Sequence, residues 1–115
     1  MTRGTSALTG AGFHILVALG DAERHGYEIM QVVAEDTGGA VRTGPTTLYR
    51  SIRGLMEAGL IEESDRRPAP EVDDERRRYY RLTAAGRDAA RAETERLRRL
   101  VAVADTRTLG GPADP

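Results

Sequence analysis

Apolar residues in the first third of the chain recur every three or four positions, which is the spacing of an amphipathic helix. The first such segment covers residues 8–19 and ends before Gly20. The second covers residues 27–36, and the glycines that follow it favour a left-handed C-terminal cap. The expected core residues are Ala11, Ile15, Leu16 and Leu19 in the first segment and Tyr27, Met30, Val33 and Ala34 in the second.

A third helical segment is predicted from Pro45, which suits the first turn of a helix, to Ala58. On a helical wheel its two faces differ in chemistry. One face is apolar and the opposite face is polar, with no acid before residue 57. We therefore expect one side of this helix to pack on its own domain while the other faces outward. The apolar face carries Leu48, Ile52, Leu55, Met56 and Gly59; the polar face carries Thr46, Arg50, Arg53 and Glu57, with Thr47 and Tyr49 on the flanks.

A change from helical to alternating periodicity predicts a β-hairpin after the third helix. Residues 60–63 form its first arm, a polar stretch with two prolines covers residues 64–75, and residues 76–82 form its second arm. Thr83 is then expected to cap a last helix over residues 84–104. The alternation places Arg78, Tyr80 and Leu82 on one face of the second arm. The last helix has an apolar stripe formed by Leu97, Leu100, Val101 and Ala104.

The composition narrows the classes of function. The chain has 115 residues, which fit one domain with an appended helix, and it contains no Cys and only two His. It has no apolar run long enough for a signal peptide or a membrane span, so we expect a soluble, cytoplasmic protein. No nucleophile–base pair, phosphate loop or metal cluster stands out, so we expect neither an enzyme nor a cofactor. A metal site is an alternative on ligand type, although the spacing is not a recognised one, from Asp21, Glu23, His25 and Glu28.

The charge of the chain is segregated although its total is only −1. All seventeen cations are Arg, and two acid-free segments, 41–56 and 76–81, carry +3 and +4, which leaves −8 for the remainder. Arg offers planar, bidentate donors that suit phosphate and guanine. The two segments are therefore candidates for nucleic-acid contact. The alternative is that they are ordinary solvated faces in an Arg-rich composition.

The order of three helices followed by a hairpin is that of a winged helix-turn-helix, so the predicted fold class is mainly α with a small β-hairpin wing and a C-terminal dimerisation helix. At four places the chain also resembles the PadR family of transcriptional regulators. The matching segments, in the family's order and spacing, are HGYEI at 25–29, TLYR at 47–50, LMEAGLI at 55–61 and RYYRLTAAG at 78–86. With the first and last helices, the resemblance covers about residues 8–104.

The resemblance implies a homodimeric regulator, in most cases a repressor, that binds a palindromic DNA operator and releases it when a small apolar or aromatic effector binds. A recognition helix needs an apolar face that packs on its own domain and a polar face that meets DNA. The third predicted helix has both faces. The residues expected to face the operator are Tyr27, Thr46, Thr47, Tyr49, Arg50 and Arg53, together with Arg76, Arg77 and Arg78 of the wing.

The C-terminal helix is expected to pack on the partner's first helix. The dimer interface would then contain Phe13, Leu16, Leu97, Leu100, Val101 and Ala104. An effector cavity between these two helices would be lined by Phe13, Val17, Leu97, Leu100 and Val101. The stripe on the last helix could instead fold back on its own domain.

The sequence departs from the family pattern in the loop of the wing, where four acids directly precede the arginines, and these would be repelled by phosphate. They favour an alternative function, a winged-helix module that binds another protein and not DNA. The acids are Glu71, Asp73, Asp74 and Glu75.

The predicted organisation has four parts. These are a flexible N-terminus (1–7), a winged helix-turn-helix domain (8–83), a dimerisation helix (84–104) and a disordered tail (105–115).

Overall fold

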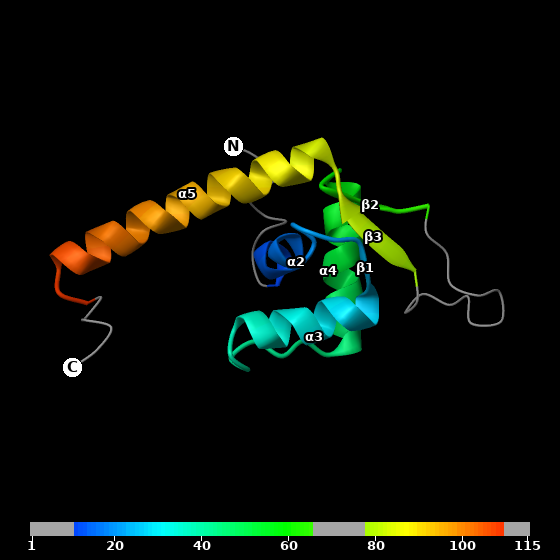
Figure 1. Cartoon of the computed structure of the whole chain (residues 1–115), viewed down its shortest axis with the longest axis horizontal. Helices are drawn as coiled ribbons and strands as arrows, with labels where there is room; N and C mark the ends of the chain where they lie inside the picture. Colours follow the sequence, from blue (N-terminus) through cyan, green and yellow to red (C-terminus); the bar gives the residue numbers. More distant parts are fainter. Residues whose placement is uncertain (1–10, 66–77, 110–115) are drawn as a thin grey trace.

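The computed structural model describes residues 11–65 and 78–109. Within them the chain forms four longer helices and three short strands, arranged as Figure 1 shows. The predicted flexible N-terminus, the start of the first predicted helix, the four loop acids, Arg76 and Arg77 lie outside the described residues. The elements are α2 (Gly12–Ala18), β1 (Arg24–His25), α3 (Gly26–Asp36), α4 (Pro45–Glu57), β2 (Ile61–Glu63), β3 (Tyr79–Leu82) and α5 (Ala84–Thr106).

The expected fold class is confirmed: the chain is mainly helical, with a small antiparallel sheet and a long C-terminal helix. The predicted hairpin is present as β2 and β3, which pair with Ile61 opposite Leu82 and Glu63 opposite Tyr80. A third strand, β1, pairs with the other edge of β3 and gives the order β1-β3-β2. The sequence did not reveal β1 because a two-residue strand has no periodicity to detect.

The core lies where α2, α3 and α4 meet the sheet. α2 and α4 present the residues that their periodicity predicts, and the inner side of the sheet closes the core through Tyr80 and Ile61. Two predicted residues do not belong to this core face: Met56 is 38% exposed at the edge of α4, and Gly59 is exposed beyond the end of the helix. The largest fully buried side chains are Ile15, Leu16, Ile29, Val33, Leu48, Ile52 and Leu55.

The inward face of α3 differs from the predicted one. Ile29 and Val33 are buried, whereas Tyr27 is 56% exposed and Met30 and Ala34 only flank the core. Val33 is buried as expected, but the buried face centres on Ile29 and Val33, which lie four residues apart on the side that meets the core, and Tyr27 lies outside it. Tyr27 is therefore a surface residue.

The junction between the sheet and α5 is tightly packed around Gly86. The Thr83 hydroxyl accepts a hydrogen bond from the Gly86 amide at 3.0 Å, as expected for an N-cap, and donates one to the Gly59 carbonyl at 2.6 Å. The Thr83 amide also donates to the Leu60 carbonyl at 3.1 Å. A Cβ atom on Gly86 would lie 1.8 Å from that same carbonyl oxygen, so only glycine allows this approach.

Helix α5 begins against the domain and then leaves it (Figure 1). It contacts α2 and β3, but Leu100 and Val101 in its second half are 55% and 60% exposed. It ends at Thr106, two residues beyond the predicted end, so the predicted tail begins later than residue 105. None of the helices in the described ranges is apolar over a length that would cross a membrane.

Candidate nucleic-acid interface

The outward side of α4 is a polar surface on a helix anchored from behind. Leu48, Ile52 and Leu55 are completely or almost completely buried, whereas Arg50 and Arg53 are exposed on the other side. This is the division of faces that the sequence predicts. A helix held in this way presents its polar side chains on the outward side while its main apolar residues stay buried.

The first turn of α4 adds an electropositive end to this surface. Gly44 is the N-cap and makes no side-chain capping bond, and the first turn contains no acid. Its amide groups and the helix dipole therefore favour an anion. Thr46 and Thr47 are both exposed in the same turn, where their hydroxyl groups can donate to phosphate or to base edges.

Arg50 keeps its charge available to a partner. No ion pair joins it to another residue in the ranges 11–65 and 78–109. Arg50 lies in the middle of the outward face of α4, where its side chain is exposed.

Tyr49 is not on the outward surface, contrary to the sequence-based expectation. Its side chain is only 7% exposed. The ring packs on α3 so closely that a Cβ atom on Gly26 would lie 2.3 Å from the Tyr49 hydroxyl oxygen. Tyr49 therefore joins α3 to α4 within the domain, which explains why a glycine occupies the first turn of α3.

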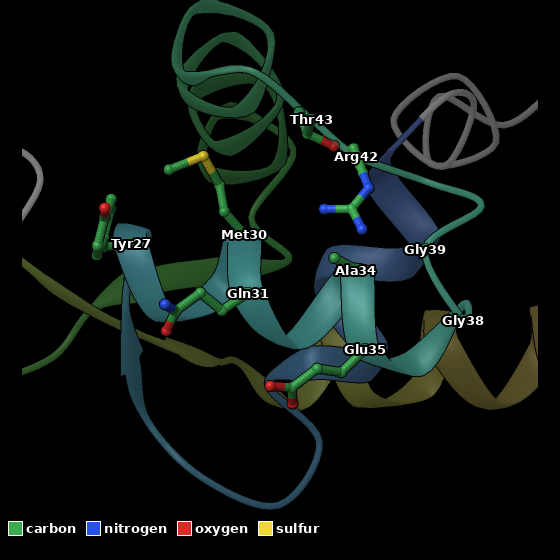
Figure 2. A pocket seen from close by; sticks show the side chains of 9 residues that line it. All are labelled: Tyr27, Met30, Gln31, Ala34, Glu35, Gly38, Gly39, Arg42 and Thr43. Atoms are coloured by element: carbon green, nitrogen blue, oxygen red, sulfur yellow. The ribbon is translucent and has the colours of Figure 1, made fainter.

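Tyr27 and the loop between α3 and α4 form the sides of a hollow near the start of α4 (Figure 2). Arg42 and Thr43 lie on the loop side. Arg42 lies in the basic segment 41–56 but is not among the residues that the sequence predicts as site residues. The signal was weak because a loop residue has no periodicity to say which way it points. The hollow is lined by Tyr27, Met30, Gln31, Ala34, Glu35, Gly38, Gly39, Arg42 and Thr43.

A histidine cap sets the start of α3 and hence the position of Tyr27. The His25 Nδ1 atom accepts a hydrogen bond from the Glu28 amide, and Glu28 Oε1 accepts one from the His25 amide, both at 3.1 Å. The His25 ring also meets Tyr79 of β3 edge-on, with ring centroids 5.3 Å apart. His25 thus has a structural role, and the described residues contain no group of three or more side chains suited to a metal ion.

The wing contributes fewer free cations than its sequence indicates. Arg78 is exposed just before β3. Arg81 instead donates to Glu62 on the neighbouring strand at 2.8 Å and lies 3.6 Å from Glu23. The hydrogen bond to Glu62 raises the pKa of the Arg81 guanidinium above its ordinary value. Arg81 therefore holds the sheet together and its charge is largely balanced within the domain.

The residues expected at a dimer interface fall into two groups. Leu16 is fully buried in the domain core, so it is not available to a partner chain. Phe13 is half-buried on α2, and Leu97 and Ala104 are half-buried on α5. Leu100 and Val101, on the second half of α5, are exposed.

A groove runs between α2 and the first half of α5. Its floor is apolar, with Leu16, Val17 and Leu82, and Arg87 and Arg91 lie along it. Of the five residues expected to line an effector cavity, only Val17 lines this groove. The other four were expected to meet a partner chain, so that cavity stays a prediction.

The sequence matches a family model, described as the transcriptional regulator PadR-like family, over residues 15–92. The matched range contains the core, the sheet, α3, α4 and the first part of α5. A comparison with curated protein sequences gave no match.

Several solved structures share the fold. A transcriptional regulator from Clostridium thermocellum is similar with a TM-score of 0.69 and 25% identity, over 90% of this chain and 93% of that one. A PadR family transcription regulator from Clostridium difficile gives 0.67 and 24%, over 84% and 97%. Bacillus subtilis PadR in complex with operator DNA gives 0.65 and 20%, over 76% of this chain and 48% of that one. This chain therefore aligns with about half of the Bacillus protein.

Proposed function

We propose that this protein, which belongs to the transcriptional regulator PadR-like family, binds double-stranded DNA as a homodimer and represses transcription by occupying a palindromic operator. The observation that carries the proposal is the outward face of α4, which combines exposed Thr residues with Arg50, an exposed cation that has no ion pair within the described residues, on a helix whose other face is buried. The major groove is wide enough to admit an α-helix, and the polar face of α4 would then meet the base edges.

Within the groove the residues of α4 have different tasks. Arg50 and Arg53 have the donor geometry that pairs with guanine, and they supply the choice of sequence. Thr46, Thr47 and the free amides of the first turn hold the phosphate backbone and fix the register of the helix. Arg78, just before β3, together with Arg76 and Arg77, adds backbone contacts from the wing.

The second half of α5 supplies the dimer contact in this proposal. Leu100 and Val101 are neighbouring apolar side chains, 55% and 60% exposed, on a part of the helix that extends away from its own domain, so a partner that covers them is favoured by the hydrophobic effect. A second copy of the chain covers them by packing its first helix, through Phe13, against α5. The two α4 helices of the dimer then lie about 34–36 Å apart, one turn of the duplex.

Release of the operator is proposed to follow the binding of a small apolar or aromatic molecule between α5 of one chain and the first helix of its partner. The support is the apolar character of Val17, Leu97, Leu100 and Val101. A molecule seated there changes the angle between the two domains and so the spacing of the α4 helices. Candidate ligands at saturation should shift both the melting temperature and the operator affinity; if they shift neither, this part of the proposal is wrong.

Selection of bound sequences from a random DNA pool tests the proposed function. The expected result is enrichment of one palindrome whose half-sites are centred about 10 base pairs apart. The selected duplex should then be retarded in a gel, and less so as salt is raised. No enrichment, and no retardation at low salt, would contradict DNA binding and favour the alternative of a protein-interaction module.

A further inference from the structure

We propose that the hollow between α3 and the loop leading to α4 holds one backbone phosphate of the bound duplex, with Arg42 as its cation. This inference rests on the proposed function and adds a contact that the sequence did not reveal. The phosphate would lie beside the bases that α4 reads, because Thr43, which also lines the hollow, immediately precedes the N-cap of α4.

The first support is the position of the Arg42 side chain. Its guanidinium points from the loop toward α3, into the hollow (Figure 2). It lies over Gly39, where an added Cβ atom would be 3.3 Å from a guanidinium nitrogen. Gly39 has a φ of +87°, a conformation that glycine adopts without strain, and this allows the loop to fold back beneath the Arg42 side chain.

The second support is that neutral hydrogen-bond donors belong to the same hollow. Tyr27, Gln31 and Thr43 are among its lining residues, and each carries a hydroxyl or amide donor. These are neutral donors of the kind that hold phosphate oxygens in protein–DNA complexes. Glu35 also lines it, yet no ion pair links Glu35 to Arg42 in the part of the chain that the structure describes.

The balance of charge decides the strength of the site. One Arg with one acid in the same hollow has little attraction for a free anion in solution. A duplex phosphate is different, because α4 and its dimer partner already hold the backbone in place and the contact costs little further entropy. The hollow is therefore expected to bind a phosphate of a bound duplex and not a free anion. Because phosphates are the same in every sequence, this contact does not select bases.

The experiment compares Arg42→Ala with the wild-type protein on the selected operator and on an unrelated duplex of equal length, over a series of salt concentrations. Loss of one phosphate contact lowers the slope of log affinity against log salt by about 0.9. A dimer with two copies loses about 1.8, which is a weakening of about sixtyfold at 0.1 M salt that vanishes near 1 M. The loss should be the same for both duplexes, and Arg42→Lys should keep the wild-type slope.

Two controls accompany this variant. Arg107→Ala removes the same charge from an exposed site at the end of α5, and it should leave the slope unchanged. Glu35→Gln removes the acid and should tighten binding to both duplexes equally. Thermal unfolding of Arg42→Ala should match the wild type, because its side chain is exposed.

Three results would overturn the proposal. If Arg42→Ala keeps the wild-type slope and affinity while Arg50→Ala loses its preference for the operator, the hollow holds no phosphate but the proposed function stands. If Arg42→Ala weakens the operator alone, Arg42 reads bases. If the wild-type protein binds no duplex at any salt concentration, both this inference and the proposed function fail.

Discussion

Replacement of Gly86 by Ala tests whether the junction between the sheet and α5 is as close as the structure shows. The new Cβ atom would lie 1.8 Å from the Leu60 carbonyl oxygen, and real contacts of this kind are not found below 3.0 Å. The helix must therefore move by at least about 1.2 Å relative to the backbone at Leu60. No side-chain rotation relieves the contact, because both partners are fixed to the main chain.

The magnitude follows from two opposing effects. Overpacking costs about 1–3 kcal/mol, and a backbone contact belongs at the upper end of that range. Ala is favoured over Gly in a helix by up to about 1 kcal/mol, which offsets part of the loss. We therefore expect the free energy of unfolding to fall by about 2 kcal/mol, and the movement also breaks the bond from the Thr83 amide to Leu60.

Urea unfolding at one fixed protomer concentration measures this effect, since the stability of the proposed dimer would depend on concentration. Gly54→Ala is the matched control: Gly54 is exposed within α4, and a Cβ atom there meets nothing within 4 Å. It should raise the free energy of unfolding by up to about 1 kcal/mol. A Gly86→Ala protein as stable as the wild type, or equal shifts in both variants, would refute the reasoning.

Three further changes test other parts of the account. His25→Ala should cost about 1 kcal/mol of unfolding free energy in urea by removing the cap of α3; His25→Asn, which retains a capping acceptor, should cost clearly less, and equal losses would contradict the capping role. Leu100→Asp should leave the fold intact but give a monomer in sedimentation, and an unchanged dimer would rule out this face of α5 as the interface. The hydrogen bond from Arg96 lowers the pKa of the Glu93 carboxyl, so the pair stabilises the fold above the ordinary Glu pKa and loses its effect as pH falls; Arg96→Ala should raise the Glu93 pKa in an NMR titration, and no change would contradict that pairing.

The sequence predicted the long elements well because their chemistry repeats. The apolar face of α4 and the Thr83 cap of α5 depend on residues within a few positions of each other, and both were confirmed. The polar face of α4 followed from the same wheel, so the exposed positions of Arg50 and Arg53 were also predictable.

What the sequence could not give depends on residues far apart in the chain. Tyr49 was expected on the surface but is buried, because the close approach of its ring to Gly26 is a contact between helices and leaves no periodic signal. Leu16 was assigned to an interface although its own domain buries it. Arg42 was overlooked because its direction depends on how the loop folds back over Gly39.

In the proposed function, the outward face of α4 selects the DNA sequence. The most direct measurement is the ratio of affinities for the selected operator and for an unrelated duplex, in the wild-type protein and in Arg50→Ala at the same salt concentration. Loss of a bidentate contact to a base should reduce the binding free energy that favours the operator by roughly 1–3 kcal/mol per half-site, which lowers the ratio of affinities. The affinity for the unrelated duplex should fall much less. An unchanged ratio in Arg50→Ala would contradict the claim.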